Sequence, residues 1–261
     1  MNKKSHLRIF WELIKTDPNL RKKTIIDHLI NVLILIGVMT TIFTYIFTQF
    51  GMTKDFGGFQ LVGMIASICI FEIYSSCSSF FADLEGNKTI SYYLTLPIPS
   101  WMIFIKQALA LSCRTLLVTS LIIPFGKLLI GSRLDLSNFS VIKFVLIFLA
   151  TNFFFSAFTL LMLGIFKGIE TLRTLWIRII FPLWFLGGAE FEWNMLYNLS
   201  PTFGYLGLLN PFVYAMEGIR AAVLGQEGFI PYWISLSVLT GLTILFTWIG
   251  ITRLKKRLDF V

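Results

Sequence analysis

The sequence is poor in charged residues. Asp, Glu, Lys and Arg make up 14% of its 261 residues, whereas hydrophobic residues make up 56%. A soluble domain has about 25% charged residues, because its whole surface needs polar side chains. A surface that faces lipid has no such need. The composition therefore excludes an ordinary soluble fold and predicts a polytopic membrane protein.

Metal-binding and redox side chains are scarce as well. The chain has only three cysteines and two histidines. Cys69, Cys77 and Cys113 fit no zinc or redox spacing. All three fall within apolar stretches, so we expect them to be small buried hydrophobic side chains. His6 and His28 are too few and too far apart to build a site. The sequence therefore predicts no metal centre.

Nucleotide-binding and hydrolase motifs are absent from the sequence. The nearest approach to a Walker A loop, Glu85–Thr89, lacks the upstream glycine and the Gly-Lys-Ser/Thr ending that cradle phosphates. The sequence contains no Gly-x-Ser-x-Gly elbow and no His-Glu-x-x-His pair. We therefore expect that the chain is not an enzyme, has no catalytic residues and binds no cofactor of its own.

Six long apolar stretches are present instead. A helix needs about 20 mostly apolar residues to cross the hydrocarbon core, and only the fifth stretch falls clearly short of that. No internal repeat or low-complexity linker separates them, so we predict an all-α fold with a single transmembrane domain over residues 1–261. The expected spans are Ile25–Phe50, Phe59–Phe81, Ala108–Ile130, Val141–Phe166, Leu172–Leu186 and Ile230–Ile251.

The Lys and Arg residues predict the orientation of these spans. Seven of the 22 lie in residues 1–23 and four lie in residues 253–257. Six spans place both termini on one side of the membrane, and the positive-inside rule makes that side the cytoplasm. Five further cations are expected in cytoplasmic connections: Lys88, Lys106, Lys167, Arg173 and Arg178. Anionic lipids of the bilayer attract such cations, so the basic charge requires no nucleic-acid partner.

The N-terminal segment, residues 1–24, has the pattern of an interfacial helix. Leu7, Phe10, Trp11 and Ile14 share one helical stripe, and charged residues lie largely opposite. Such an amphipathic helix is suited to the membrane surface. The alternative is a polar tail with a few apolar residues, and the tryptophan and the flanking lysines favour the helix.

The predicted cytoplasmic connection over residues 82–101 has more order than a simple loop. The connection begins with the acidic residue Glu85 and continues through an apolar helical stripe of Ile90, Tyr93 and Leu94. The helical pattern stops at Pro97 and Pro99 and starts again at Trp101. Proline disfavours continuation of a helix. We therefore expect a short helix beneath the membrane, and the alternative is an ordered loop that packs under its own bundle.

The predicted outer connection over residues 187–228 is long and yet apolar. Ordinary connections are much shorter. Irregular backbone at membrane depth must be buried in protein or line a cavity. We therefore expect re-entrant helices that dip into the outer leaflet before the last span. The alternative is a seventh and an eighth span, but Pro201, Asn210 and Pro211 break the apolar run.

Two charged residues fall inside predicted spans. Glu72 and Arg114 lie about nine and six residues from the cytoplasmic ends of the second and third spans, or roughly 13 and 9 Å at 1.5 Å per residue. A charge in hydrocarbon is costly, so each should face protein or water. We expect a pair that fixes the register of the two helices; the alternative is a polar point on a substrate path.

The sequence before the last span resembles a known family. The segment Asn210–Gly225 is similar to the Asn-Pro-x-x-Tyr…Glu/Gly…Arg…Leu-Gly signature of ABC type-2 exporter permeases. The residues that carry the likeness are Asn210, Pro211, Tyr214, Glu217, Arg220 and Gly225. Residues 80–101 resemble that family's coupling region, and the order of the elements extends the likeness over essentially the whole chain. Leu186–Glu192 departs from the family pattern by adding two acidic residues near the expected outer gate.

The resemblance implies the permease subunit of an ATP-driven exporter in a bacterial cytoplasmic membrane. Two copies would form a path for an amphipathic lipid, glycan or drug-like substrate. Two copies of a separate cytoplasmic ATPase would bind ATP and Mg²⁺, and a coupling helix over Glu85–Trp101 would contact them. The alternatives are a self-sufficient secondary transporter or channel, which would usually show broken spans or repeats, and a membrane-embedded enzyme, for which a catalytic motif is missing.

Overall fold

The structure is a computed structural model that describes residues 3–258, and this part of the chain is helical and contains no strand. Six helices are long and apolar enough to cross a membrane, which confirms the predicted all-α membrane fold. The six spans are Lys22–Phe50, Phe56–Glu85, Ser100–Arg133, Val141–Ile165, Ile169–Ala189 and Tyr232–Leu258. Residues 1–2 of the predicted interfacial segment lie outside the described residues.

Several spans are built from more than one helical piece. The first joins α2 (Lys22–Thr41) to a π-helical turn (Ile42–Ile46) and a 3₁₀ turn (Phe47–Phe50). The third joins α5 (Ser100–Thr119), α6 (Ile122–Ile130) and a 3₁₀ turn (Gly131–Arg133). The fifth joins a 3₁₀ turn (Ile169–Thr171), α8 (Leu172–Leu175), a π-helical turn (Trp176–Ile180), α9 (Phe181–Trp184) and a second π-helical turn (Phe185–Ala189).

The remaining spans are single helices, and shorter helices lie between and before the spans. The second, fourth and sixth spans are α3 (Phe56–Glu85), α7 (Val141–Ile165) and α13 (Tyr232–Leu258). The others are α1 (Lys3–Lys15), a 3₁₀ turn (Pro18–Leu20), α4 (Thr89–Leu94), α10 (Trp193–Leu199), α11 (Pro201–Gly207) and α12 (Pro211–Val223).

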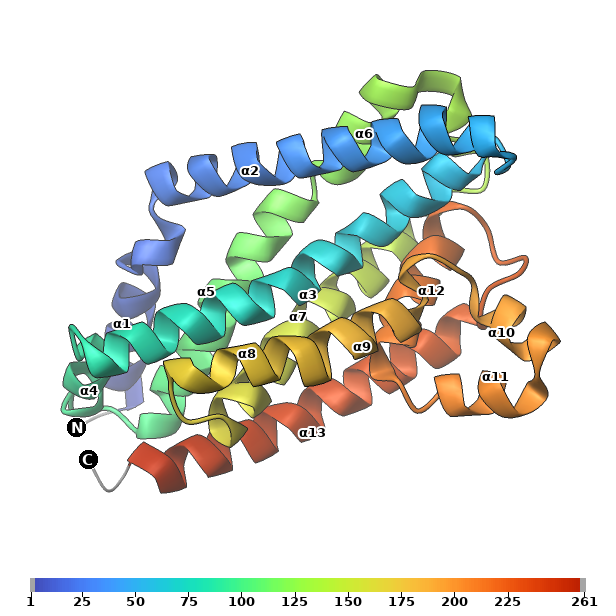
Figure 1. The fold of residues 1–261 in the computed structure, drawn as a ribbon. Coiled ribbons are helices and arrows are strands. Elements are labelled where there is room, and N and C mark those ends of the chain that lie inside the picture. The colour runs from blue at the N-terminus through green and yellow to red at the C-terminus, as the bar shows by residue number, and fades with distance from the viewer. Residues whose placement is uncertain (1–2, 259–261) are drawn as a thin grey trace.

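The bundle has two distinct ends. Both termini and α4 lie at one end, which we call the terminal end, whereas α10 to α12 lie at the opposite, far end (Figure 1). Helix α3 passes between α2 and the fifth span (Figure 1). In the apolar 18-residue stretch of each span, 83% of α3 is buried inside the bundle, against 22% of the first span and 17% of the sixth. The second span is therefore the core of the bundle, and the first and sixth lie at its edge.

Small residues allow α7 and α13 to pack closely. A Cβ atom added to Gly250 would lie 2.8 Å from the carbonyl carbon of Leu160, and one added to Gly164 would lie 2.9 Å from Cβ of Arg253. Small residues serve the same purpose at many membrane helix interfaces. Further towards the far end, Phe154 and Phe158 of α7 pack against Phe212 of α12. The far-end segment is thereby joined to the main core.

The N-terminal helix α1 uses only half of its apolar stripe for packing. Phe10 and Ile14 are buried against Met102 of α5, whereas Leu7 and Trp11 are more than half exposed. Helix α1 therefore lies against the terminal end of the bundle and leaves two large apolar side chains free to enter the membrane surface.

Three expectations from the sequence are wrong in detail. Lys106 lies inside α5 rather than in a connection, because a buried ion pair with Asp17 compensates its charge. Arg173 and Arg178 lie inside the fifth span, Ile169–Ala189, rather than in a connection, and the span predicted from Leu172 already included both. Cys113 is exposed on the surface of the bundle, whereas Cys69 and Cys77 are buried as expected.

Candidate functional site

Helix α4 at the terminal end is capped by the helix that precedes it. The carboxylate of Asp83 accepts hydrogen bonds from the backbone N–H groups of Thr89 and Ile90, at 3.2 and 2.8 Å. Such a carboxylate satisfies backbone donors that the first turn of a helix leaves unpaired. Lys88 makes the turn between the two helices with a φ of 55°. The position of α4 is therefore fixed relative to α3.

The predicted coupling stripe faces its own bundle. Ile90 is buried, and Tyr93 and Leu94 are partly buried. The ammonium group of Lys106 lies 5.1 Å from the centre of the Tyr93 ring, and burial raises the pKa of the Tyr93 hydroxyl. These three side chains therefore pack under their own bundle, which is the alternative that the sequence left open for this segment.

Other side chains make up the exposed surface of this segment. The side chain of Tyr92 is 63% exposed and that of Trp101 is 48% exposed. Glu85 and Pro97 are exposed too, and Oε1 of Glu85 accepts a hydrogen bond of 3.3 Å from the backbone N–H of Ile169. The predicted helix over Glu85–Trp101 is limited to Thr89–Leu94. Sequence reasoning missed Tyr92, which lies just outside the apolar stripe.

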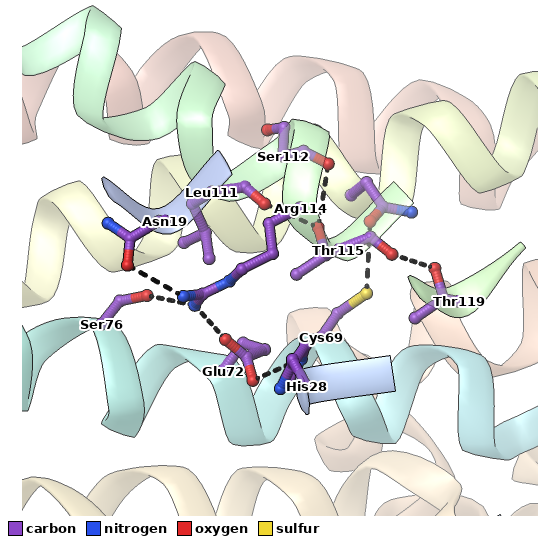
Figure 2. A network of polar contacts seen from close by, with 11 residues as sticks. Asn19, His28, Cys69, Glu72, Ser76, Leu111, Ser112, Arg114, Thr115 and Thr119 are labelled. Carbon is purple, nitrogen blue, oxygen red and sulfur yellow. Dashed lines mark hydrogen bonds and ion pairs between the residues drawn. The ribbon is translucent and has the colours of Figure 1, made fainter. Parts of the chain in front are cut away.

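A second group of polar residues lies inside the spans. The guanidinium of Arg114 on α5 forms an ion pair with the carboxylate of Glu72 on α3 (Figure 2). Nε2 of His28 on α2 lies 3.0 Å from the other carboxylate oxygen. Arg114 also donates to Oδ1 of Asn19 at 3.3 Å and to Oγ of Ser76 at 3.4 Å. We call Asn19, His28, Glu72, Ser76 and Arg114 the span network.

The span network joins three spans and the segment after α1 through side chains alone. Figure 2 shows hydroxyl groups continuing along α5 beyond Arg114, with Thr115 donating to the carbonyl of Leu111 at 3.1 Å. Nearby, Sγ of Cys69 donates to Oδ1 of Asn152 on α7 at 3.5 Å. Because each charged group has an opposite partner, the network compensates the cost of burying ions.

A third group lies at the far end, around Arg220 of α12. This side chain is fully buried, and its guanidinium donates to the carbonyls of Gly188 and Ala189, at 2.6 and 3.1 Å. It also donates to the carbonyl of Phe59 at 3.4 Å and lies 3.6 Å from the centre of the Phe59 ring. Gly63 makes room, because a Cβ atom there would lie 2.5 Å from Nη2 of Arg220.

Glu217 lies one turn before Arg220 and binds backbone donors. Its carboxylate accepts hydrogen bonds from the N–H groups of Trp193 and Ile230, both at 3.1 Å. Burial raises the pKa of Glu217, against the opposing effect of Arg220. Burial also lowers the pKa of Arg220, to about 10. The two side chains, which we call the far-end bracket, hold the end of the fifth span, the start of α10 and the start of the sixth span.

The other residues of the Asn-Pro segment shape α12. Oδ1 of Asn210 caps the helix by accepting from the N–H of Phe212 at 3.0 Å, and Nδ2 donates to the carbonyl of Leu183 at 2.7 Å. Pro211 occupies the first turn, where its missing N–H costs nothing. The Tyr214 hydroxyl donates to the carbonyl of Leu208 at 2.9 Å, and Gly225 has a φ of 113°. All six predicted residues therefore lie in α12 or within two residues of its ends.

Residues 187–228, the predicted outer connection, contain no further span. Its longest helix, α12, has 13 residues and measures about 20 Å, too short to cross a hydrocarbon core of about 30 Å. Helices α10 and α11 have seven residues each. Three short helices therefore replace the alternative seventh and eighth spans. Their depth in the outer leaflet stays a prediction.

The two acidic residues that depart from the family pattern line a pocket of about 340 Å³ at the far end. Glu190 accepts a hydrogen bond from Nε2 of Gln60 at 2.7 Å, and burial raises the pKa of Glu190. Glu192, Phe59 and Phe229 line the same pocket, and the rings of Phe59 and Phe229 are stacked with their centres 6.4 Å apart. Among the residues described, no group of His, Cys, Asp and Glu side chains could hold a metal ion.

Comparison with known proteins identifies the family. The model of the ABC-2 type transporter family matches residues 21–224, which is well over half of the chain. The match includes the first five spans, α4 and the far-end bracket. No curated protein matches the chain. The chain therefore belongs to the ABC-2 type transporter family, as a multi-pass permease component of an ABC transporter that is not itself catalytic.

Proposed function

We propose that the chain is the permease of an ATP-driven exporter in a bacterial cytoplasmic membrane, with the terminal end in the cytoplasm. Two copies enclose the path of an amphipathic lipid, glycan or drug-like substrate. Two copies of a separate ATPase bind ATP and Mg²⁺ beneath them. The positive-inside rule supports this orientation, since residues 1–23 and 253–257 are rich in Lys and Arg.

The observation that carries the proposal is the attachment of α4. A capped helix with an exposed aromatic side chain, Tyr92, lies at the terminal end directly after α3, the most buried span. The Asp83 cap and the contact between Glu85 and Ile169 connect this end to the second and fifth spans. A force applied to α4 from the cytoplasm would therefore move packed spans as units, which is the way many transport proteins switch between states.

The test is a mild-detergent purification of the tagged chain from its native membrane, followed by mass spectrometry and an ATPase assay. We expect a P-loop ATPase in the eluate of the wild type and its loss in Tyr92→Asp. Tyr205→Asp on α11 is the matched control, because its side chain is 61% exposed against 63% for Tyr92 but lies at the far end.

Tyr92 is the better position for this test than Tyr93 or Leu94. Those two side chains pack against the bundle, so a charge there would also disturb the fold. Loss of the ATPase in both Tyr92→Asp and Tyr205→Asp would contradict a specific contact at α4. A wild-type chain that purifies and transports alone would instead be a self-sufficient transporter or channel.

A further inference from the structure

Arg178 lies level with the middle of α3, the most buried span. Two residues before it, Trp176 packs against Phe71 and Tyr74 of α3, with ring centres 5.8 and 5.6 Å apart. Six residues after it, Trp184 donates a hydrogen bond of 3.0 Å to Oγ of Ser67. Arg178 is therefore level with the stretch from Ser67 to Tyr74, which is the middle third of α3.

The ends of α3 are equally distant from this stretch. Ser67 is 11 residues from the first residue of α3 and Tyr74 is 11 residues from the last. At 1.5 Å per residue, each end of α3 lies about 16 Å beyond it. A fully extended arginine side chain is shorter than this distance, so Arg178 cannot bring its charge to the level of either end of α3.

The side chain of Arg178 is exposed and has no partner. It is exposed on the surface of the bundle, next to Ile177, which is 53% exposed. Within residues 3–258 it forms no hydrogen bond and no ion pair. Arginine is among the most costly side chains to place in hydrocarbon at the centre of a helix. This face of the fifth span must therefore meet water or protein rather than lipid.

The chain itself offers no carboxylate to Arg178. In the described residues the only acidic side chain near the middle of a span is Glu72, which Arg114 and His28 already engage. The other acids of the spans, such as Asp83 and Glu170, lie close to the terminal end. A second copy related by two-fold symmetry would add another Arg178 and no acid. If water fills this face, a ligand with a negative charge is the partner that would pair with Arg178 there.

The two residues before Arg178 in the chain, Trp176 and Ile177, line a groove that suits the rest of such a ligand. It has a volume of about 320 Å³ and is lined by Tyr74, Arg173, Trp176 and Ile177. Arg173 is exposed near the start of the fifth span, so a second guanidinium lies at the terminal side of the groove. Aromatic and aliphatic walls, with Arg173 in the lining and Arg178 directly after Ile177, favour a molecule with an apolar body and a negatively charged head.

We propose that Arg178 binds the anionic head of the exported substrate, and that this substrate is an anionic amphiphile carried between two copies of the chain. This inference rests on the proposed function. It narrows the substrate from amphipathic molecules in general to those with a phosphate or carboxylate head, and it assigns Arg178 as the group that selects them.

The first test measures water at this face. In a Cys113→Ser background, which removes the exposed native cysteine, Ile177→Cys is treated in membranes with a charged methanethiosulfonate. Ile244→Cys is the matched control, because Ile244 is 69% exposed and lies near the middle of α13. Thiolates form and react in water, so we expect reaction at residue 177 and none at residue 244. Equal protection of both residues would overturn the proposal.

The second test measures binding to the purified chain and needs no ATPase. The probes are dodecyl phosphate, dodecylphosphocholine and inorganic phosphate. We expect dodecyl phosphate to bind most tightly, Arg178→Gln to weaken it about tenfold or more through loss of a charge-assisted contact, and Arg178→Lys to retain most of the affinity. Because Arg178 has no partner within the described residues, both variants should keep the melting temperature of the wild type.

Two results would overturn the assignment. Equal affinity for dodecyl phosphate and dodecylphosphocholine in the wild type would exclude selection by charge. Competition by inorganic phosphate at equal concentration would show an anion site that does not recognise an amphiphile. Binding that depends on Arg178 in a chain that recruits no ATPase would instead leave the site in place and refute the exporter, so the two failures can be told apart.

Discussion

The span network and the far-end bracket both bury charged groups, but they satisfy them differently. In the span network, Glu72 and Arg114 bind each other and further side chains. In the far-end bracket, Arg220 and Glu217 bind backbone groups at the ends of helices. A set of side chains can be replaced together, whereas backbone carbonyls and N–H groups remain when a side chain is removed. We infer that the bracket is irreplaceable and that the network can be exchanged for apolar residues.

The largest effect is expected from removing the whole far-end bracket. In Arg220→Leu/Glu217→Leu, the carbonyls of Gly188 and Ala189 and the N–H groups of Trp193 and Ile230 lose their partners inside the protein. Each buried unsatisfied group costs about 1–3 kcal/mol, so we expect no folded protein by fluorescence-detected size exclusion. Arg173→Leu, at an exposed arginine, is the control. A double variant that is as stable as the wild type would refute the distinction.

The span network should behave in the opposite way. Glu72→Ala alone leaves Arg114 buried without its counterion, which typically costs about 3–5 kcal/mol. The set Glu72→Leu/Arg114→Leu/His28→Leu should recover most of that loss, because apolar replacement of a whole buried ion group is often neutral. Thermal unfolding in detergent measures both. If Glu72→Ala keeps full stability but abolishes transport, the network belongs to the substrate path and its structural role is wrong.

Gly63 allows a smaller and more local test of the bracket. A methyl group at this position would lie 2.5 Å from Nη2 of Arg220, so Gly63→Ala should displace the guanidinium and cost about 1–3 kcal/mol through overpacking. Gly241→Ala on α13 meets nothing within 4 Å and should be neutral or slightly stabilising, by up to about 1 kcal/mol. The difference in melting temperature between the two variants is the measurement.

The smallest effect concerns pH. Burial raises the pKa of Glu217 above its ordinary value of 4.5, while Arg220 opposes this and Glu192 adds to it. Stability from Glu217 is therefore fully present below pH 4.5 and is lost as the pH rises through the folded-state pKa, at about 1.4 kcal/mol per pH unit between the two values. The melting temperature relative to Glu217→Gln should fall over that window. A difference that rises with pH would contradict the burial argument.

Much of the fold follows from local sequence. Apolar length predicts the six spans, and the Asn-Pro start of α12 marks a helix with a side-chain cap. Lys106 and Arg178 were predicted in connections but lie in spans. A charge in a span needs a partner side chain or contact with water, and the local sequence pattern reveals neither. Asp17, the partner of Lys106, lies 89 residues away in the chain.

The candidate sites were predicted less completely than the spans. Glu72 and Arg114 are visible as charges at similar depth, but nothing in the sequence brings His28 to them. The apolar stripe of Ile90 and Tyr93 predicts α4 correctly as a helix, and yet the stripe marks the side that packs inward. Exposed partner surfaces carry little periodic signal, so Tyr92 emerges only once the packing of α4 is known.

The central claim is that this permease works in pairs with a separate ATPase. Native mass spectrometry of the complex extracted from its own membrane tests it most directly. The account predicts an assembly of two copies of this chain with two copies of a P-loop ATPase that hydrolyses ATP. A chain that leaves the membrane alone, or only with itself, and still moves substrate without ATP would contradict it.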